Sequence, residues 1–207
     1  MLFTEVVSAS TLDLLRKLQS LPDFADLRLV GGTSLALQIG HRISVDLDFF
    51  GKEDSSLDEL TDLISKFASV SPLSSSRLMR FLIVNGVKVD IVNYPYPWID
   101  SPVISDGLVL AGIKDIAAMK LSAITNRGTK KDFIDYYFLL QRFSLDELIE
   151  FYKQKYSDYQ LFTALKSLTY FEDAENDPMP KMIQPVDWSV VKSSICERVS
   201  AYLKKQS

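Results

Sequence analysis

The chain has 207 residues, of which 47% are hydrophobic and 24% charged, so it can bury a substantial core and is not a disordered protein. No apolar run approaches the roughly 20 residues that cross a bilayer, and the N-terminus lacks a secretion-signal pattern, so we expect a cytoplasmic protein with no membrane partner. One cysteine and one histidine exclude an internal disulfide and a four-ligand zinc site, which leaves oxygen ligands for any metal.

The first hundred residues alternate helical and extended patterns. We predict a helix over residues 8–21, a strand over 27–30, a turn at Gly31-Gly32, a short helix from Thr33 to Ile39 and a second strand over 45–50. Ser56 and Glu59 have the spacing of a capping box, which predicts a helix through Phe67. Asn85-Gly86 between two apolar runs, 81–84 and 87–92, predicts a hairpin with a type I′ turn.

The second half of the chain is helical. Pro95, Pro97 and Pro102 interrupt regular structure, and a boundary near residues 107–112 divides a catalytic lobe, residues 1–110, from a helical lobe, residues 111–207. The helices predicted in that lobe cover residues 113–126, 130–142, 144–156, 160–168 and 188–204. The fold class is therefore α/β (α+β), a small mixed sheet followed by helices, with the functional site expected in a cleft between the two lobes.

Two aspartates on the second predicted strand are the strongest candidates for chemistry. Alternate side chains of a strand share a face, so Asp46 and Asp48 project together while Leu47 and Phe49 face the core. Two carboxylates so close repel each other unless a cation lies between them, and Mg²⁺ favours one or two carboxylates with water and phosphate oxygens. An ordinary solvated acidic strand face is the simpler interpretation of this pair taken alone.

Neighbouring motifs strengthen the catalytic interpretation. Gly31 and Gly32 permit close approach of a phosphate, and the helix that begins at Thr33 and Ser34 offers free backbone N–H groups to it; a plain tight turn is the alternative. Asp90, on the second strand of the predicted hairpin, is a candidate third metal ligand, although it is equally explained as an exposed residue between core valines.

Charged residues outside this sheet complete the candidate site. Lys120 presents a positive charge suited to a triphosphate, and Arg42 is placed to add a bidentate clamp. Asp132 and Asp135, three residues apart on one helix, are candidates either to orient Lys120 or to act as a base. Capping of the helix N-terminus is a competing explanation of Asp132.

The net charge of −4 gives no general attraction to nucleic acid, so an RNA partner requires a local basic surface. Residues 114–131 hold five cations and one acid, a local charge of +4, and are the segment where an RNA backbone would dock; two solvated helix faces are the alternative. The five cations are Lys114, Lys120, Arg127, Lys130 and Lys131.

These motifs resemble a known family. Val30-Gly31-Gly32, thirteen residues and then Asp46-Leu47-Asp48-Phe49 is similar to the signature of the polymerase-β-like nucleotidyltransferase superfamily. Within that superfamily the chain resembles the AbiEii/AbiGii abortive-infection toxins at several ordered motifs, which span residues 25 to the C-terminal helix. These are Gly31 to Leu35, Arg42 to Phe50, Met119-Lys120, Lys130 to Asp135 and Asp187-Trp188.

The resemblance implies Mg²⁺-dependent (or Mn²⁺-dependent) transfer of a nucleotidyl group from a nucleoside triphosphate, with tRNA as an acceptor in some members and an antitoxin as partner. The chain departs from the superfamily at Gly32, where many members carry serine, so Thr33 or Ser34 would have to supply a hydroxyl contact. Two alternatives stay open: a phosphatase with Asp46 as nucleophile, disfavoured by Phe50, and a non-catalytic module that keeps the fold to bind nucleotide or partner.

Overall fold

The structure is a computed structural model that describes residues 1–206, and the chain divides into two compact units. Unit 1 comprises Met1–Tyr96 and Ser101–Ala111, and unit 2 comprises Pro97–Asp100 and the chain from Gly112 onward. The short segment Pro97–Asp100 therefore packs with the helices of unit 2, although in the sequence it separates the two parts of unit 1.

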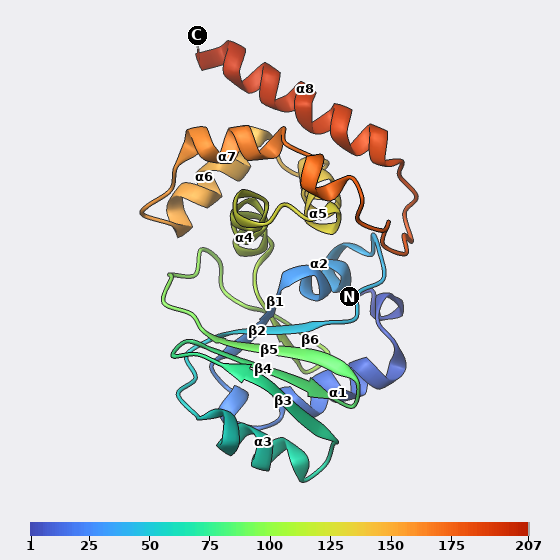
Figure 1. The fold of residues 1–207 in the computed structure, drawn as a ribbon, viewed down its shortest axis with the longest axis vertical. Coiled ribbons are helices and arrows are strands. Elements are labelled where there is room, and N and C mark those ends of the chain that lie inside the picture. The colour runs from blue at the N-terminus through green and yellow to red at the C-terminus, as the bar shows by residue number, and fades with distance from the viewer. Residues whose placement is uncertain (207) are drawn as a thin grey trace. The chain divides into compact units, whose positions relative to one another are not determined.

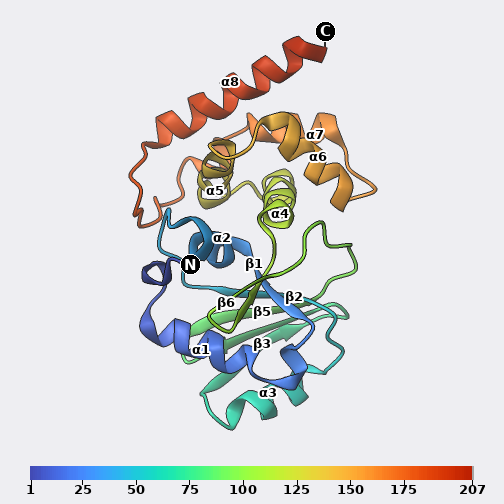
Figure 2. The same ribbon diagram turned by 180° about the vertical axis from the view of Figure 1, so that it is seen from behind.

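A mixed seven-stranded sheet forms the centre of unit 1, in the order β3-β4-β5-β2-β1-β7-β6 (Figures 1 and 2). The pairs β1–β7 and β2–β5 are parallel and the others are antiparallel. The strands are β1 (Leu27–Val30), β2 (Leu47–Gly51), β3 (Val70–Ser75), β4 (Met79–Val84), β5 (Val87–Asn93), β6 (Val103–Ser105) and β7 (Leu108–Leu110), and the α-helices are α1 (Ala9–Gln19), α2 (Gly31–Ile39) and α3 (Leu57–Ser65), with 3-10 turns at Thr4–Val6 and Pro22–Phe24.

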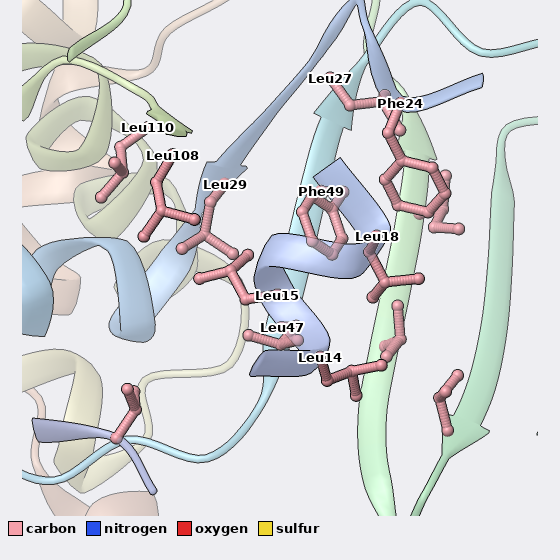
Figure 3. Packing of buried hydrophobic residues seen from close by; sticks show 14 of the residues in the cluster. Leu14, Leu15, Leu18, Phe24, Leu27, Leu29, Leu47, Phe49, Leu108 and Leu110 are labelled. Atoms are coloured by element: carbon pink, nitrogen blue, oxygen red, sulfur yellow. The ribbon is translucent and has the colours of Figure 1, made fainter. Parts of the chain in front are cut away.

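Helices α1 and α3 contribute to one hydrophobic core with the odd-numbered residues of β1, β2 and β5. Leu14, Leu15 and Leu18 of α1 point toward Leu29, Leu47 and Phe49 of the sheet (Figure 3). Each fully buried side chain of this kind contributes on the order of 2 kcal/mol by leaving water. Because alternate side chains of a strand face opposite ways, the even-numbered residues of these strands are left for the other face.

Local sequence signals explain where most elements begin and end. The capping boxes at Ser56 and Ser144 are both formed, each with the glutamate three residues later bonded back to the cap. Asn85 and Gly86 have φ values of +50° and +80°, which confirms the type I′ hairpin between β4 and β5. Helix α2 ends at Gly40, whose φ of +67° suits glycine.

Five helices form unit 2: α4 (Ile113–Asn126), α5 (Lys130–Leu140), α6 (Leu145–Lys155), α7 (Leu161–Leu168) and α8 (Trp188–Gln206), with a 3-10 turn at Glu172–Ala174. Helix α4 contacts α5, α6 and α7, while α8 packs along α5, α6 and α7 through Val191, Ile195, Val199 and Tyr202. None of the helices in the part of the chain described combines the length and apolar character that crossing a bilayer demands.

The predicted α/β class with a mixed sheet and a helical second half is confirmed, and three strands were not predicted. Strands β6 and β7 follow Pro102, the last of these prolines, and are joined by a tight hairpin turn at Asp106 and Gly107, with φ of +52° and +77°. Strand β3 has an exposed, serine-rich sequence and is stabilised by pairing with β4 rather than by its own apolar pattern.

Candidate active site

The face of the sheet that is turned away from α1 and α3 carries the candidate aspartates of unit 1. Along β2 the buried residues Leu47 and Phe49 alternate with half-buried Asp48 and Phe50, and Asp46 lies just before the strand. Asp48 is the register partner of Asp90 on the neighbouring parallel strand β5. Since neighbouring strands lie about 4.8 Å apart, the two carboxylates leave the same face side by side.

Gly31 makes room for one of these carboxylates. Its φ is +68°, and a Cβ added there would overlap Oδ2 of Asp48 and reach 3.1 Å from Cγ. Gly31 and Gly32 are the first residues of α2, so backbone N–H groups of the helix start next to Asp48. The glycine is therefore needed both for its backbone conformation and for the close approach.

The two oxygens of the Asp90 carboxylate have different surroundings. Its Oδ2 lies 2.5 Å from the Nζ of Lys88, two residues earlier on the same face of β5. Its Oδ1 is buried and accepts no hydrogen bond from the residues described. A buried carboxylate oxygen without a donor is costly, so this oxygen indicates a place for a ligand that the chain itself does not supply.

The donor set suits a hard divalent cation. Within residues 1–206 no cluster of three or more carboxylate, histidine or cysteine side chains surrounds a possible metal position. Mg²⁺ commonly binds one or two protein carboxylates and takes its remaining ligands from water and substrate phosphate. Asp48 and Asp90, with the space at Gly31 and the unsatisfied Oδ1, meet that smaller requirement.

Other predicted nucleotide-binding residues are buried supports. The hydroxyl of Thr33 lies 2.8 Å from the Ser44 hydroxyl and also contacts the backbone carbonyl of Asp46, so it ties the start of α2 to the segment before β2. Ser34 is fully buried and accepts from Gln38 at 3.2 Å. Arg42 is 4% exposed and donates to the backbone carbonyl of Ile43.

In unit 2 the structure brings together Lys120, Asp132 and Asp135. The Nζ of Lys120 lies 2.9 Å from Oδ1 of Asp132 and 2.6 Å from Oδ2 of Asp135, and both carboxylates are fully buried. Arg127 and Thr129 also donate to Asp132, at 3.0 Å and 2.6 Å. Two acids on one turn of α5 thus fix the ammonium of a lysine on α4.

The pKa of Asp132 follows from these contacts. Burial alone would raise the pKa of this carboxyl, but the charge of Lys120 and the donors of Arg127 and Thr129 outweigh it and hold the pKa well below its ordinary value. Asp132 is therefore a carboxylate at neutral pH and a weak base. Of the two roles predicted for it, the geometry favours orienting Lys120.

Two of the five cations predicted to form a basic surface over residues 114–131 do not reach the surface. Lys120 and Lys130 are buried, at 5% and 6% exposure, and the Lys130 ammonium donates to the backbone carbonyls of Glu175 and Asp177. Lys114 pairs with Asp100 at 3.1 Å, and Arg127 is bound to Asp132. Lys114, Lys120 and Arg127 therefore neutralise nearby acids, and Lys130 binds backbone carbonyls. Asp100 and Asp132 lie outside residues 114–131, so the charge count of that segment did not include them.

A second buried ion pair was not predicted. Asp115 and Lys155 are 2.7 Å apart and fully buried. Asp115 accepts from the backbone N–H groups of Ile99 and Asp100, and Lys155 donates to the carbonyl of Pro97 and lies 4.6 Å from the centre of the Trp98 ring. The pair therefore holds the segment Pro97–Asp100 on α4 and α6. An acid in the first turn of α4 was its only local signal.

Known proteins share this architecture. The model of a family described as "Nucleotidyl transferase AbiEii toxin, Type IV TA system" matches residues 13–197. The chain belongs to the AbiEii nucleotidyltransferase toxin family. It is a nucleotidyltransferase, and the predicted family and enzyme class are confirmed.

Individual relatives match nearly all of the chain. It is 36% identical over 196 residues to an uncharacterized protein of Aquifex aeolicus (strain VF5), covering 92% of this chain and 94% of the relative. A crystal structure of a candidate nucleotidyltransferase from H. pylori has a TM-score of 0.61 at 20% identity and 96% coverage of both chains. The nucleotidyltransferase toxin MenT4 of Mycobacterium tuberculosis H37Rv has a TM-score of 0.58 at 16% identity, over 93% of this chain and 84% of the MenT4 chain. The H. pylori and M. tuberculosis structures therefore share the fold of this chain.

Replacing Gly31 by alanine tests the space beside Asp48. We expect Gly31→Ala to lower the rate of pyrophosphate release by about 100-fold, because displacement of a reacting group by about 1 Å costs that much. Gly86→Ala is the matched control, since Gly86 also has a positive φ, of +80°, but nothing lies within 4 Å of its added Cβ. Both variants should lose thermal stability, and Gly31→Ala should lose more because its added Cβ also displaces Asp48. A wild-type rate in Gly31→Ala would contradict the interpretation.

Replacing Asp132 by asparagine tests the buried cluster. Because folding lowers the pKa of Asp132, its carboxylate stabilises the fold fully above the unfolded pKa of about 3.9. This contribution is lost as the pH falls from that value toward the lower pKa of the folded state. Wild type should exceed Asp132→Asn by about 3 kcal/mol at pH 7 in urea unfolding, and the difference should shrink toward pH 3. Asp146→Asn, which removes a carboxylate that is 48% exposed, should cost below about 1 kcal/mol. A difference that stays constant with pH would exclude this account.

Proposed function

We propose that the chain transfers a nucleotidyl group from a nucleoside triphosphate to an RNA acceptor, tRNA, in a Mg²⁺-dependent reaction, as the toxin of a toxin–antitoxin pair. The observation that carries the catalytic part is the in-register pair Asp48 and Asp90 beside the start of α2 at Gly31. Family membership supports the toxin role and an antitoxin partner.

The residues of this face have distinct tasks in the proposed reaction. Asp46, Asp48 and Asp90 would hold Mg²⁺ (or Mn²⁺), which when bound supplies positive charge to the phosphates and lowers the pKa of the acceptor hydroxyl. The N–H groups at Gly31, Gly32 and Thr33 bind the distal phosphates at the positive end of α2. The acceptor oxygen bonds to the α-phosphorus as the bond to pyrophosphate breaks.

Lys88 has a role in the free protein. Its ammonium, 2.5 Å from Asp90, offsets one of two neighbouring negative charges when no substrate is bound. Like charges side by side on adjacent strands are destabilising, so a nearby lysine keeps the carboxylates on this face without unfolding the sheet. Lys88 would then exchange its position with the incoming cation.

Lys120 is the proposed positive charge from unit 2. Its ammonium is fixed by Asp132 and Asp135, so its direction is set before substrate binds. Fixed dipoles and charges of this kind require no reorganisation during the reaction. Arg42 and Ser34 are proposed to support the phosphate-binding start of α2 from within the fold, because both are buried.

The proposal of an RNA acceptor rests on the family, and no surface feature of residues 114–131 supports it. Four of the five cations there contact acids or backbone carbonyls of unit 2. An acceptor bound by base stacking and shape rather than by a broad basic surface accords with the chain's net charge of −4.

The proposal is tested by incubating the protein with each α-labelled nucleoside triphosphate, Mg²⁺ and total tRNA. We expect label on tRNA with wild type, and at least a 1,000-fold loss in Asp48→Asn and Asp46→Asn, because metal ligands act directly on the reacting phosphate. Asp54→Asn, an exposed acid after β2, is the control and should retain wild-type transfer. Label transfer that survives both substitutions would refute the mechanism, and label on protein but not RNA would refute the acceptor.

A further inference from the structure

Three aromatic rings form a continuous group next to the carboxylates of unit 1. The ring centres of Phe50 and Tyr94 are 5.1 Å apart and those of Tyr94 and Tyr96 are 5.2 Å apart, with tilts of 50° and 58°. Phe50 and Tyr94 are half-buried, and Tyr96 is 44% exposed. The group therefore has a packed inner end and an accessible outer end.

These rings stand on the same face as the acids. Phe50 follows Asp48 by two residues on β2, and Tyr94 continues the alternation of Asp90 and Val92 just beyond β5. Two residues of a strand advance about 6.6 Å, so the rings begin immediately beyond the carboxylates. The backbone N–H of Tyr94 donates to the Gly51 carbonyl at 2.8 Å, which keeps this part of the chain against the end of β2.

The local sequence holds the rings in place. Tyr94 and Tyr96 each precede a proline, Pro95 and Pro97. A residue before proline is disfavoured in the helical region, and proline itself has a fixed φ. The segment is thereby kept extended, which places the two tyrosines on one side, and the rings lose little freedom when a ligand binds.

The order of groups along the strands suggests what these rings contact. The start of α2 at Gly31 lies at the level of Leu47, between Asp46 and Asp48, and Phe50 lies beyond Asp48 with Arg28 of β1 as its register partner. In the proposed function the distal phosphates lie at α2 and the α-phosphate at the acids. The nucleoside of the same molecule then extends toward Phe50.

We propose that Phe50, Tyr94 and Tyr96 form a stacking platform for the base of the nucleoside triphosphate. This inference rests on the proposed function for the position of the phosphates. Aromatic rings stack on every base, and larger bases stack more strongly. The platform therefore accepts all four triphosphates and favours purines, with discrimination weaker than a hydrogen-bonding pocket would give.

The test measures binding, by calorimetry with Mg²⁺ and no acceptor, of the four nucleoside triphosphates and of base-free ribose 5-triphosphate. Tyr96→Leu and Phe50→Leu keep apolar bulk and remove the aromatic ring. We expect each to weaken nucleoside triphosphate binding by about tenfold and to leave ribose triphosphate binding unchanged. Tyr170→Leu, at a tyrosine that is 50% exposed in unit 2, is the matched control and should change neither.

The outcomes separate this inference from the proposed function. Base-dependent binding that is lost in the leucine variants supports the platform even if the protein transfers nothing to any acceptor. Unchanged triphosphate binding in both variants overturns the platform while leaving the transfer reaction intact. Equal weakening for ribose triphosphate also overturns it, because the rings would then support the fold or the phosphates rather than the base.

Discussion

The pairing of β2 with β5 is the constraint on which the site depends, because it fixes Asp48 beside Asp90. A parallel register slipped by one residue would turn one acid into the core and expose a leucine or valine. Leu47, Phe49, Val89 and Ile91 are fully buried on the opposite face, so their burial holds the register that brings the acids together. The hydrophobic core thus compensates for the repulsion between two carboxylates.

Unit 2 uses a different solution for its charges. Its buried acids are each matched by a buried or neighbouring cation, as in Asp115 with Lys155 and Asp132 with Lys120. Such pairs are costly to desolvate and costly to break, and they specify geometry more than they add stability. On the sheet face, by contrast, Oδ1 of Asp90 is buried and accepts no hydrogen bond from the residues described. This difference distinguishes a site for an external ligand from a structural ion pair.

The sequence predicts elements that depend on neighbouring residues. The capping box at Ser56, the turn at Asn85-Gly86 and the end of the short helix at Ile39 are all set within a few residues, and each was predicted correctly. The alternation of Leu47, Asp48 and Phe49 likewise separates core from site without knowledge of the partner strand.

Properties that depend on distant residues were not predictable. Lys130 has the sequence context of an exposed lysine, yet it is buried and its ammonium donates to backbone carbonyls 45 and 47 residues away. The pair Asp115 and Lys155 joins residues 40 positions apart. The contact of Lys120 with Asp132 and Asp135 was among the predicted roles, whereas the donors Arg127 and Thr129 of Asp132 were not predicted.

The central claim is that Asp48 and Asp90 together hold one divalent cation, and binding of Mn²⁺ followed by electron paramagnetic resonance tests it most directly. The measurement uses a nucleoside triphosphate analogue whose bond between the α- and β-phosphates cannot be broken. We expect one bound Mn²⁺ in wild type and at least tenfold weaker binding in both Asp48→Asn and Asp90→Asn. Wild-type Mn²⁺ affinity in folded Asp90→Asn would contradict it.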